Sequence, residues 1–408
     1  MKINLPPKVE YIINKIYENN YEAYIVGGCV RDAILGLKPH DYDITTSAPP
    51  DAIIDIFKDF RCIETGIQHG TVSIVIEKDI YEITTYRIEG EYKDHRRPES
   101  VDFTNKLEED LKRRDFTINA MAYNEKEGLI DLFGGKEDIE SRVIRTVGNP
   151  YDRFNEDGLR MIRAIRFSSK LDFQIEEDTL KAIYDNANII EDISLERITD
   201  EFSKIILSDN PENIIYLFKT KILKYLNVSN EENEHKLLKL YKRINILKKI
   251  DKNLVKRLVV LDYLMEDLQI NTKSFCTTLI YSKKIIKNHD TILELLKNVK
   301  IERLDKFMIK KILNKIDKNL FEEYLDISRV IYKDEKNFIK IIDILKEIEE
   351  NNECYNIKNL KVNGKDIMSL GYKNKEIGEI LTYLLEEVIK NPKINQKELL
   401  MEKIKKYR

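Results

Sequence analysis

The sequence predicts an α/β N-terminal head followed by an all-helical remainder. Short runs rich in β-branched and aromatic residues are confined to the first 150 positions, at 24–26, 42–45, 71–76, 81–87 and 118–123. Beyond Asn149-Pro150 such runs fade, and Leu, Ile, Lys and Glu recur at helical spacing to the C-terminus. The chain has 408 residues, more than one hydrophobic core usually serves, so several domains are expected.

Individual elements follow from local signals. A first helix is expected after Pro6-Pro7, because proline is favoured at helix starts and Ile12, Ile13 and Ile16 recur at helical spacing. The charged stretch Glu89–Asn105 is expected to form a long loop, a kind of segment that is often functional. Further helices are expected at 153–170, 176–187, 195–207 and 211–226.

Charge is distributed unevenly along the chain. Residues 1–150 carry 20 Lys and Arg against 28 Asp and Glu, and the remainder carries 49 against 44. An acidic front half suits a metal site, and a basic rear half suits a polyanion such as nucleic acid.

The four cysteines favour neither a zinc module nor a disulfide framework, because they show no paired spacing. The first residues lack the apolar core of a signal peptide, and no apolar run is long enough to span a bilayer. We therefore expect a cytoplasmic protein with reduced thiols and no membrane partner.

The segment from Gly27 to Asp43 is the first that carries chemistry. Gly27-Gly28 follows a short apolar run and opens an expected helix, so backbone N–H groups and the helix N-terminus could hold a triphosphate, with Arg31 on its oxygens. Asp41 and Asp43 lie two residues apart, which would place both carboxylates on one face of a strand. Such a pair offers Mg²⁺ the oxygen ligands it prefers, although D-x-D also occurs in ordinary turns.

A third carboxylate would help to complete a metal shell or orient an attacking hydroxyl. Glu82 is the candidate, because on a strand it shares one face with Thr84 and Tyr86 while Ile83 lies on the other. A solvated strand glutamate is the equally good structural alternative.

Two later segments carry further polar residues. Arg114, Asp115 and Asn119 could hold a ribose and phosphates, or simply form a helix-to-strand connection. On one helix, Asp157, Arg160 and Arg163 would share a side, and an adjacent aspartate and arginine would accept from the amino group and donate to the ring nitrogen of cytosine or adenine. Uracil and guanine carry an oxygen in place of that amino group. The structural alternative is a salt bridge on a solvated helix.

In this order, the motifs resemble those of the class II tRNA nucleotidyltransferases (CCA-adding enzymes) and bacterial poly(A) polymerases. The similarity is dense from about residue 24 to 207. It also includes the segments 66–71, 142–150 and 195–201. Farther on, 362–368 and 377–381 resemble the tail of CCA-adding enzymes of the Gram-positive type.

The resemblance implies a polymerase β-like mixed sheet in a nucleotidyltransferase head (1–150), then an all-α neck with base recognition (151–210), body (211–345) and tail (346–408). The rear parts would hold tRNA at its acceptor stem and elbow. Asp41 and Asp43 would bind two Mg²⁺ ions, with Glu82 as the third catalytic carboxylate. The residues expected around the nucleotide are Gly27, Gly28, Arg31, Arg114, Asp115, Asn119, Glu156, Asp157, Arg160 and Arg163. Of these, Glu156, Asp157 and Arg160 would serve as an amino-acid template for the base, with Arg163 on the phosphates.

The activity expected is addition of CCA to the tRNA 3′ end from CTP and ATP with release of pyrophosphate. Residues 92–101 resemble a flexible loop that CCA- and A-adding members keep, which argues against CC addition; His95 departs from the small residue often found there. An A-adding enzyme and a poly(A) polymerase remain alternatives. A non-catalytic RNA-binding protein is disfavoured by the intact Asp41 and Asp43, and a phosphohydrolase by the lack of clustered histidines in 151–408.

Overall fold

The computed structural model describes residues 2–90, 95, 100–270 and 273–407, and it divides into two compact units. The first comprises residues 1–242 and 268–280, and the second comprises 243–267 and 281–408. The first unit holds all the strands of the mixed sheet, and the second is helical, as the sequence predicts. The finer division at 150, 210 and 345 stays a prediction.

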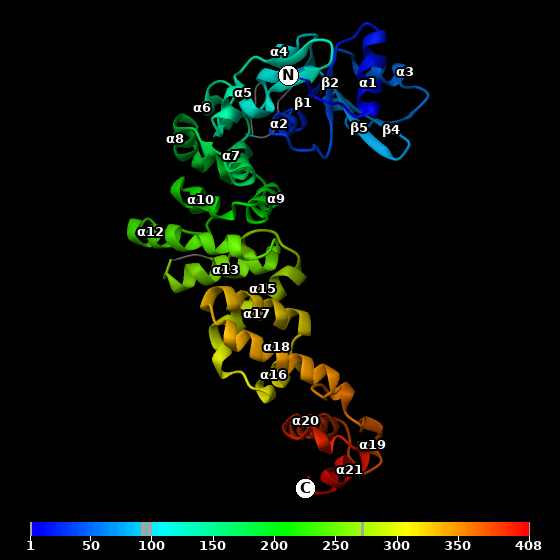
Figure 1. Ribbon diagram of the computed structural model, residues 1–408, viewed down its shortest axis with the longest axis vertical. Coiled ribbons are helices and arrows are strands. Elements are labelled where there is room, and N and C mark those ends of the chain that lie inside the picture. The colour runs from blue at the N-terminus through cyan, green and yellow to red at the C-terminus, as the bar shows by residue number, and fades with distance from the viewer. Residues whose placement is uncertain (1, 91–94, 96–99, 271–272, 408) are drawn as a thin grey trace. The chain divides into compact units, whose positions relative to one another are not determined.

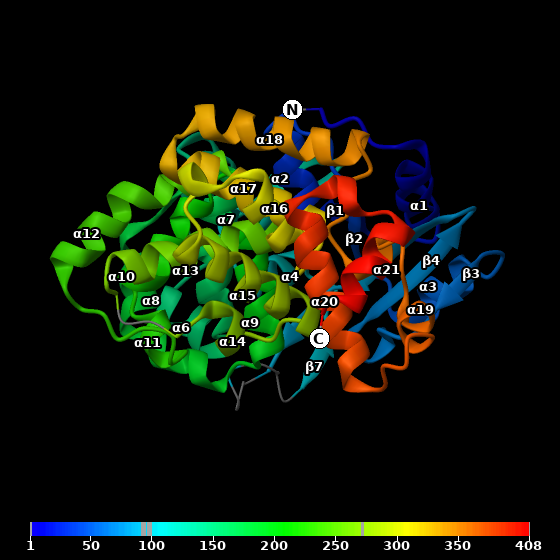
Figure 2. The ribbon, with the colours of Figure 1, turned by 90° about the horizontal axis from the view of Figure 1, so that it is seen from below.

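The head is built on a seven-stranded mixed sheet, with β3 at one edge beside β4 (Figure 2). Its strands in spatial order are β3 (Arg61–Ile63), β4 (Thr71–Ile76), β5 (Asp79–Thr85), β2 (Asp43–Thr46), β1 (Ala23–Val26), β8 (Met121–Asn124) and β9 (Gly128–Asp131). The central pair β2 and β5 is parallel, whereas β1 is antiparallel to β2. Two short ribbons lie outside this sheet: β6 (Arg87–Glu89) with β7 (Val101–Phe103), and β10 (Val143–Ile144) with β11 (Gln174–Ile175).

Register decides which side chains share the functional face. Ile44 of β2 lies opposite Ile83 of β5, and Val26 of β1 lies opposite Asp43. Because side chains alternate along a strand, Asp43 and Glu82 point to one face and the fully buried isoleucines to the other. Tyr86 follows β5 and is buried in a cluster with Tyr24, Val26 and Ala122 of the first face and with Leu111.

Helices cover the sheet and continue the first unit. α1 (Pro7–Glu18) contacts β1, and α3 (Pro50–Ile56) contacts β4 and β5 (Figure 1). Leu111 brings α4 (Leu107–Lys112) against the cluster around Tyr86. The other helices of this unit are α2 (Gly28–Ile34), α5 (Gly135–Glu140), α6 (Pro150–Glu156), α7 (Leu159–Leu171), α8 (Glu177–Asp185), α9 (Leu195–Ile206), α10 (Ile215–Lys219), α11 (Ile222–Tyr225), α12 (Glu234–Arg243, which ends at the unit boundary) and α14 (Phe275–Thr278).

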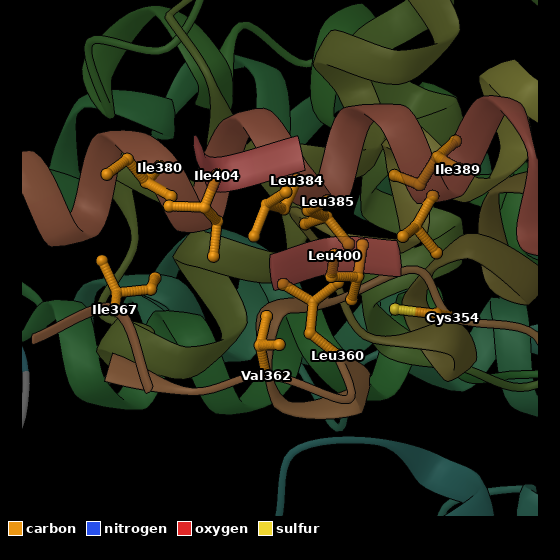
Figure 3. Packing of buried hydrophobic residues seen from close by; sticks show 11 residues of the cluster. Cys354, Leu360, Val362, Ile367, Ile380, Leu384, Leu385, Ile389, Leu400 and Ile404 are labelled. Carbon is orange, nitrogen blue, oxygen red and sulfur yellow. The ribbon is translucent and has the colours of Figure 1, made fainter. Parts of the chain in front are cut away.

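The second unit consists of packed helices whose last members enclose a core of their own. It contains α13 (Leu254–Asp267), α15 (Lys283–Asn298), α16 (Lys306–Leu313), α17 (Lys318–Tyr332), α18 (Glu335–Glu350), α19 (Gly364–Met368), α20 (Lys375–Lys390) and α21 (Lys397–Lys405). Leu384 and Leu385 of α20 pack with Leu400 and Ile404 of α21 and with Ile367 of α19 (Figure 3). None of the helices in the described ranges is both long and apolar enough to cross a membrane.

The structure confirms most predicted elements and corrects five. The strand expected at 81–87 ends at Thr85, and Arg87 begins the separate strand β6. The helix expected at 153–170 is broken into α6 and α7, and the one expected at 211–226 is interrupted by turns. The strand expected at 118–123 begins only at Met121, because a 3₁₀ turn over Thr117–Asn119 precedes it. The ends of the expected loop 89–105 pair as β6 and β7.

Candidate active site

The glycine pair forms a tight turn between β1 and α2. Gly27 has φ +79°, a conformation that side chains other than glycine rarely adopt. A Cβ on Gly27 would lie 3.2 Å from Nη1 of Arg114, so the absence of a side chain lets this arginine approach the turn. The first N–H groups of α2 have no helical acceptors, which makes the turn suitable for phosphate oxygens.

The three predicted carboxylates come together beside this turn. Asp43 is the first residue of β2, but Asp41 lies before the strand, so the prediction that both are on it is wrong. The reason is that β1 ends at Val26, opposite Asp43, and the pairing of β2 with β5 begins only at Ile44. Burial raises the pKa of Asp43, and the charges of Asp41 and Glu82 raise it further, whereas Arg114 opposes them. Mutual repulsion thus marks the three carboxylates as neighbours.

This arrangement fits a divalent cation that is shared with a substrate. In the described part of the chain, no three Asp, Glu, His or Cys side chains are grouped closely enough to make a complete metal cage. Mg²⁺ is usually bound through one or two carboxylates together with substrate phosphates, and such a cation would relieve the repulsion around Asp43. Neighbouring carboxylates of this kind suit a cation that substrate phosphates also bind.

A chain of hydrogen-bonded polar side chains, buried except for the half-buried Arg163, runs from α2 to α7. Arg31 donates from Nη1 to Oδ1 of Asn119 at 2.6 Å, and Asn119 donates to Oδ1 of Asp115 at 3.1 Å. Arg163 then donates to Oδ2 of Asp115 from Nε and Nη2, at 2.9 and 2.6 Å. The structure thus brings together four of the predicted nucleotide-binding residues, from three separate parts of the sequence.

Asp115 is the acid at the centre of this chain. Burial alone would raise its pKa, but the charge of Arg163 and hydrogen bonds from Asn119 and Arg163 lower it to about 2. The folded state therefore binds the Asp115 proton less tightly than the unfolded state, in which aspartate has a pKa of about 3.9. The resulting stabilisation is complete above the unfolded pKa and is lost as the pH falls towards the folded one.

We accordingly expect Asp115→Asn to be less stable than the wild-type protein, by an amount that is constant between about pH 7 and pH 5 and shrinks below about pH 4. Thermal unfolding of both proteins across this range measures the difference. A gap that stays constant down to pH 3.5 would mean that Asp115 contributes by shape or hydrogen bonding and not by its charge.

The base-recognition segment differs from its prediction. Asp157 and Gly158 interrupt the expected helix, so Asp157 lies between α6 and α7 and not on a helical face with Arg160. The chain leaves the helical conformation at Asp157, which has φ −141° and ψ +104°, and the following Gly158 packs so closely that a Cβ on it would lie 2.8 Å from a methyl carbon of Ile189. Among the described residues, the Asp157 carboxylate binds Arg197 of α9 at 2.8 and 3.2 Å, and Arg160 is not its partner.

The side chain of Arg160 is bound by residues other than Asp157. Its guanidinium is paired with Glu156 and donates to the carbonyl oxygens of Arg113 and Arg153, at 3.1 and 3.2 Å. The hydrogen bond to the Arg113 carbonyl oxygen connects α7 to the residue that directly follows α4. Asp157 and Arg160 therefore each have a fixed partner before any base is present.

Sequence reasoning missed three supporting residues. Arg197 lies in the similar segment 195–201, but nothing in the local sequence points to its partner 40 positions away. Arg166 lies 3.9 Å from the centre of the Phe167 ring and pairs with the buried Glu201. Asp110 of α4 could have been found, because it stands three and four positions before two arginines that directly follow this helix.

The loop prediction for 92–101 lies mostly outside the described residues. Within it, the structure describes His95, whose carbonyl oxygen accepts from the N–H of Gly158 at 3.3 Å.

The fold and the site together define a nucleotidyltransferase head joined to helical domains, and comparison with known proteins agrees. Residues 23–145 match the family model "Poly A polymerase head domain", and 172–228 match "Probable RNA and SrmB- binding site of polymerase A". Residues 256–404 match a model of tRNA nucleotidyltransferase domain 2.

Similarity to individual proteins extends over nearly the whole chain. The CCA-adding enzyme of Ligilactobacillus salivarius is 39% identical over 97% of this chain and 95% of its own, and that of Enterococcus faecalis is 35% identical over the same shares. The crystal structure of the Bacillus stearothermophilus CCA-adding enzyme in complex with CTP is 30% identical with a TM-score of 0.81, covering 99% of this chain and 98% of that one. The chain therefore belongs to the family of CCA-adding enzymes.

Proposed function

We propose that this protein is a nucleotidyltransferase that adds CCA to the 3′ end of tRNA, using CTP and ATP and releasing pyrophosphate. The observation that carries the proposal is the similarity to CCA-adding enzymes over 97% of the chain, with Asp41, Asp43 and Glu82 gathered beside the Gly27-Gly28 turn. The tRNA 3′-hydroxyl attacks the α-phosphate of the nucleotide, and the bond to the pyrophosphate breaks. The CMP and AMP units are added without a nucleic-acid template.

Mg²⁺ is the proposed cofactor, held by Asp41 and Asp43 and by the triphosphate. Two bound ions would lower the pKa of the 3′-hydroxyl and neutralise the charge of the departing pyrophosphate. The chain supplies the rest: the N–H groups at the start of α2 and Arg114 lie where a triphosphate can bind beside Asp43. Glu82 is the proposed third carboxylate, since it occupies the same sheet face as Asp43.

Selection of the base is assigned to Glu156, Asp157 and Arg160. The Asp157 carboxylate accepts from the exocyclic amino group of cytosine or adenine, and Arg160 donates to the adjacent ring nitrogen. Their pairing with Arg197 and Glu156 supports this role, because each side chain is already oriented before a base arrives. Asp115, Asn119, Arg31 and Arg163 connect this segment to the triphosphate end of the site.

We further propose a cytoplasmic location and contacts between the helical domains and the acceptor stem and elbow of tRNA. All four cysteines are free thiols, as is usual in a reducing compartment. Phosphate contacts from the basic rear half would make tRNA binding dependent on salt.

The deciding experiment offers the purified protein three tRNA substrates, ending at the discriminator base, after one C and after two Cs, with CTP, ATP or both. Completion of CCA on all three is the expected result. Extension of only the CC-ended tRNA would mean an A-adding enzyme, and unlimited A tails on many RNAs would mean a poly(A) polymerase. No incorporation at all would overturn the assignment to nucleotidyl transfer.

A further inference from the structure

Asp110 is a buried carboxylate directly behind the proposed active site. It lies on α4 and is fully shielded from solvent. Its Oδ2 accepts a hydrogen bond from Oγ1 of Thr45 at 3.1 Å, and Thr45 is also fully buried. Thr45 stands two positions after Asp43 on β2, so it points to the same face of the sheet. Asp110 is thus bonded to the strand that carries a catalytic carboxylate.

The same carboxylate holds two arginines. Its Oδ1 accepts from Nε and Nη2 of Arg113, at 3.0 and 2.7 Å, and its Oδ2 accepts from Nη2 of Arg114 at 3.3 Å. Burial alone would raise the pKa of Asp110, but the charges of Arg114 and Arg113 lower it below its usual range. The group is therefore an anion at neutral pH, and its charge keeps both guanidinium groups in place.

Each of the two arginines also contacts another part of the proposed active site. Arg114 lies against the Gly27 turn, which directly follows Val26, the residue of β1 that pairs with Asp43. Arg113 accepts through its carbonyl oxygen from Arg160, one of the proposed base-reading residues. Asp110 therefore connects the catalytic strand with the triphosphate side of the site through side chains, and with the base-reading side through Arg113.

We infer that Asp110 is a positioning residue, which fixes Arg114 between the Gly27 turn and Asp43 so that the guanidinium meets the triphosphate of either nucleotide. This inference rests on the proposed function. It assigns a role in the reaction to a side chain that cannot itself touch the substrate. Since CTP and ATP share the triphosphate, the loss of Asp110 must affect both nucleotides alike.

The test is Asp110→Asn in the full-length protein, with steady-state kinetics for CTP, ATP and tRNA. The amide keeps the size of the side chain but lacks the charge that holds both arginines. We expect KM for CTP and for ATP to rise equally, about tenfold, with KM for tRNA within twofold. A purely structural role would instead reduce the fraction of active enzyme, which lowers the apparent kcat and leaves KM unchanged.

Asp138→Asn is the matched control, because Asp138 is also a buried aspartate of the head and binds a threonine and an arginine, Thr117 and Arg145. It should lower Tm to a similar extent without raising either nucleotide KM. Should Asp110→Asn fail to fold, Thr45→Val removes the hydroxyl that bonds Asp110, together with its longer bond to the Thr84 carbonyl oxygen, and it should raise both nucleotide KM values about threefold.

An unchanged nucleotide KM in folded Asp110→Asn, or in Thr45→Val if the first variant does not fold, would overturn the inference. A rise for only one of the two nucleotides would overturn it too. Failure of the wild-type protein to add CMP and AMP would instead refute the proposed function, so the two failures are distinguishable.

Discussion

Asp43→Asn is expected to reduce the addition of both CMP and AMP about a thousandfold, because a carboxylate that binds the catalytic metal acts mainly in the transition state. Binding of tRNA should remain, since Asp43 belongs to the nucleotide end of the site. Asp41→Ala should behave in the same way. Single-turnover incorporation of each nucleotide into tRNA, together with a tRNA binding assay, measures both parts of this prediction.

The Asp43→Asn variant should also be slightly more stable than the wild-type protein. Burial and the charges of Asp41 and Glu82 raise the pKa of Asp43, so its charged form is disfavoured in the folded state and a neutral amide relieves the repulsion. Higher stability with lost activity is the expected signature of a functional carboxylate. Asp59→Asn, at an exposed aspartate of the same domain, is the control and should leave activity unchanged. Loss of tRNA binding in parallel with activity would show that Asp43 is needed for more than catalysis.

Local patterns predicted much of the head and of its acidic site. Alternation in Tyr81-Glu82-Ile83 predicted that Glu82 faces away from the core, and the structure leaves Glu82 exposed and buries Ile83. The glycine pair predicted the turn into α2, and Ile12, Ile13 and Ile16 predicted the buried face of α1. These features depend on neighbours within one or two turns of chain, which a single sequence displays directly.

The base-recognition segment could not be predicted in the same way. Helical spacing from 153 to 170 favoured one helix, but Asp157 has an extended backbone and ends α6, and nothing in the local spacing indicates this break. The partner of Asp157 is equally remote, because Arg197 lies on another helix. The roles predicted for these residues stay predictions, and tertiary packing, which the local sequence does not display, decides which of their side chains meet.

Asp157→Ala is expected to relax base selection. Without the carboxylate, nothing accepts a hydrogen bond from the amino group of cytosine, and the oxygen of uracil no longer faces a negative charge. A good bidentate contact discriminates by about 1–3 kcal/mol, so the preference for CTP over UTP should fall by about tenfold to a hundredfold. Incorporation of each nucleotide into tRNA that ends at the discriminator base measures the ratio, and an unchanged ratio would exclude Asp157 from base reading.

The Arg197→Ala variant tests whether base selection depends on the orientation of the Asp157 carboxylate as well as on its presence. It keeps the Asp157 carboxylate but removes the two bonds, at 2.8 and 3.2 Å, that hold it. Asp157 also accepts from the N–H of Leu159 at 3.1 Å, so part of its orientation survives. The preference for CTP over UTP should therefore fall in the same direction as in Asp157→Ala but by less. In the double variant, the loss should equal that of Asp157→Ala alone, because an arginine that acts through Asp157 has no effect once the carboxylate is gone. Additive losses would show instead that Arg197 contributes to selection independently of Asp157.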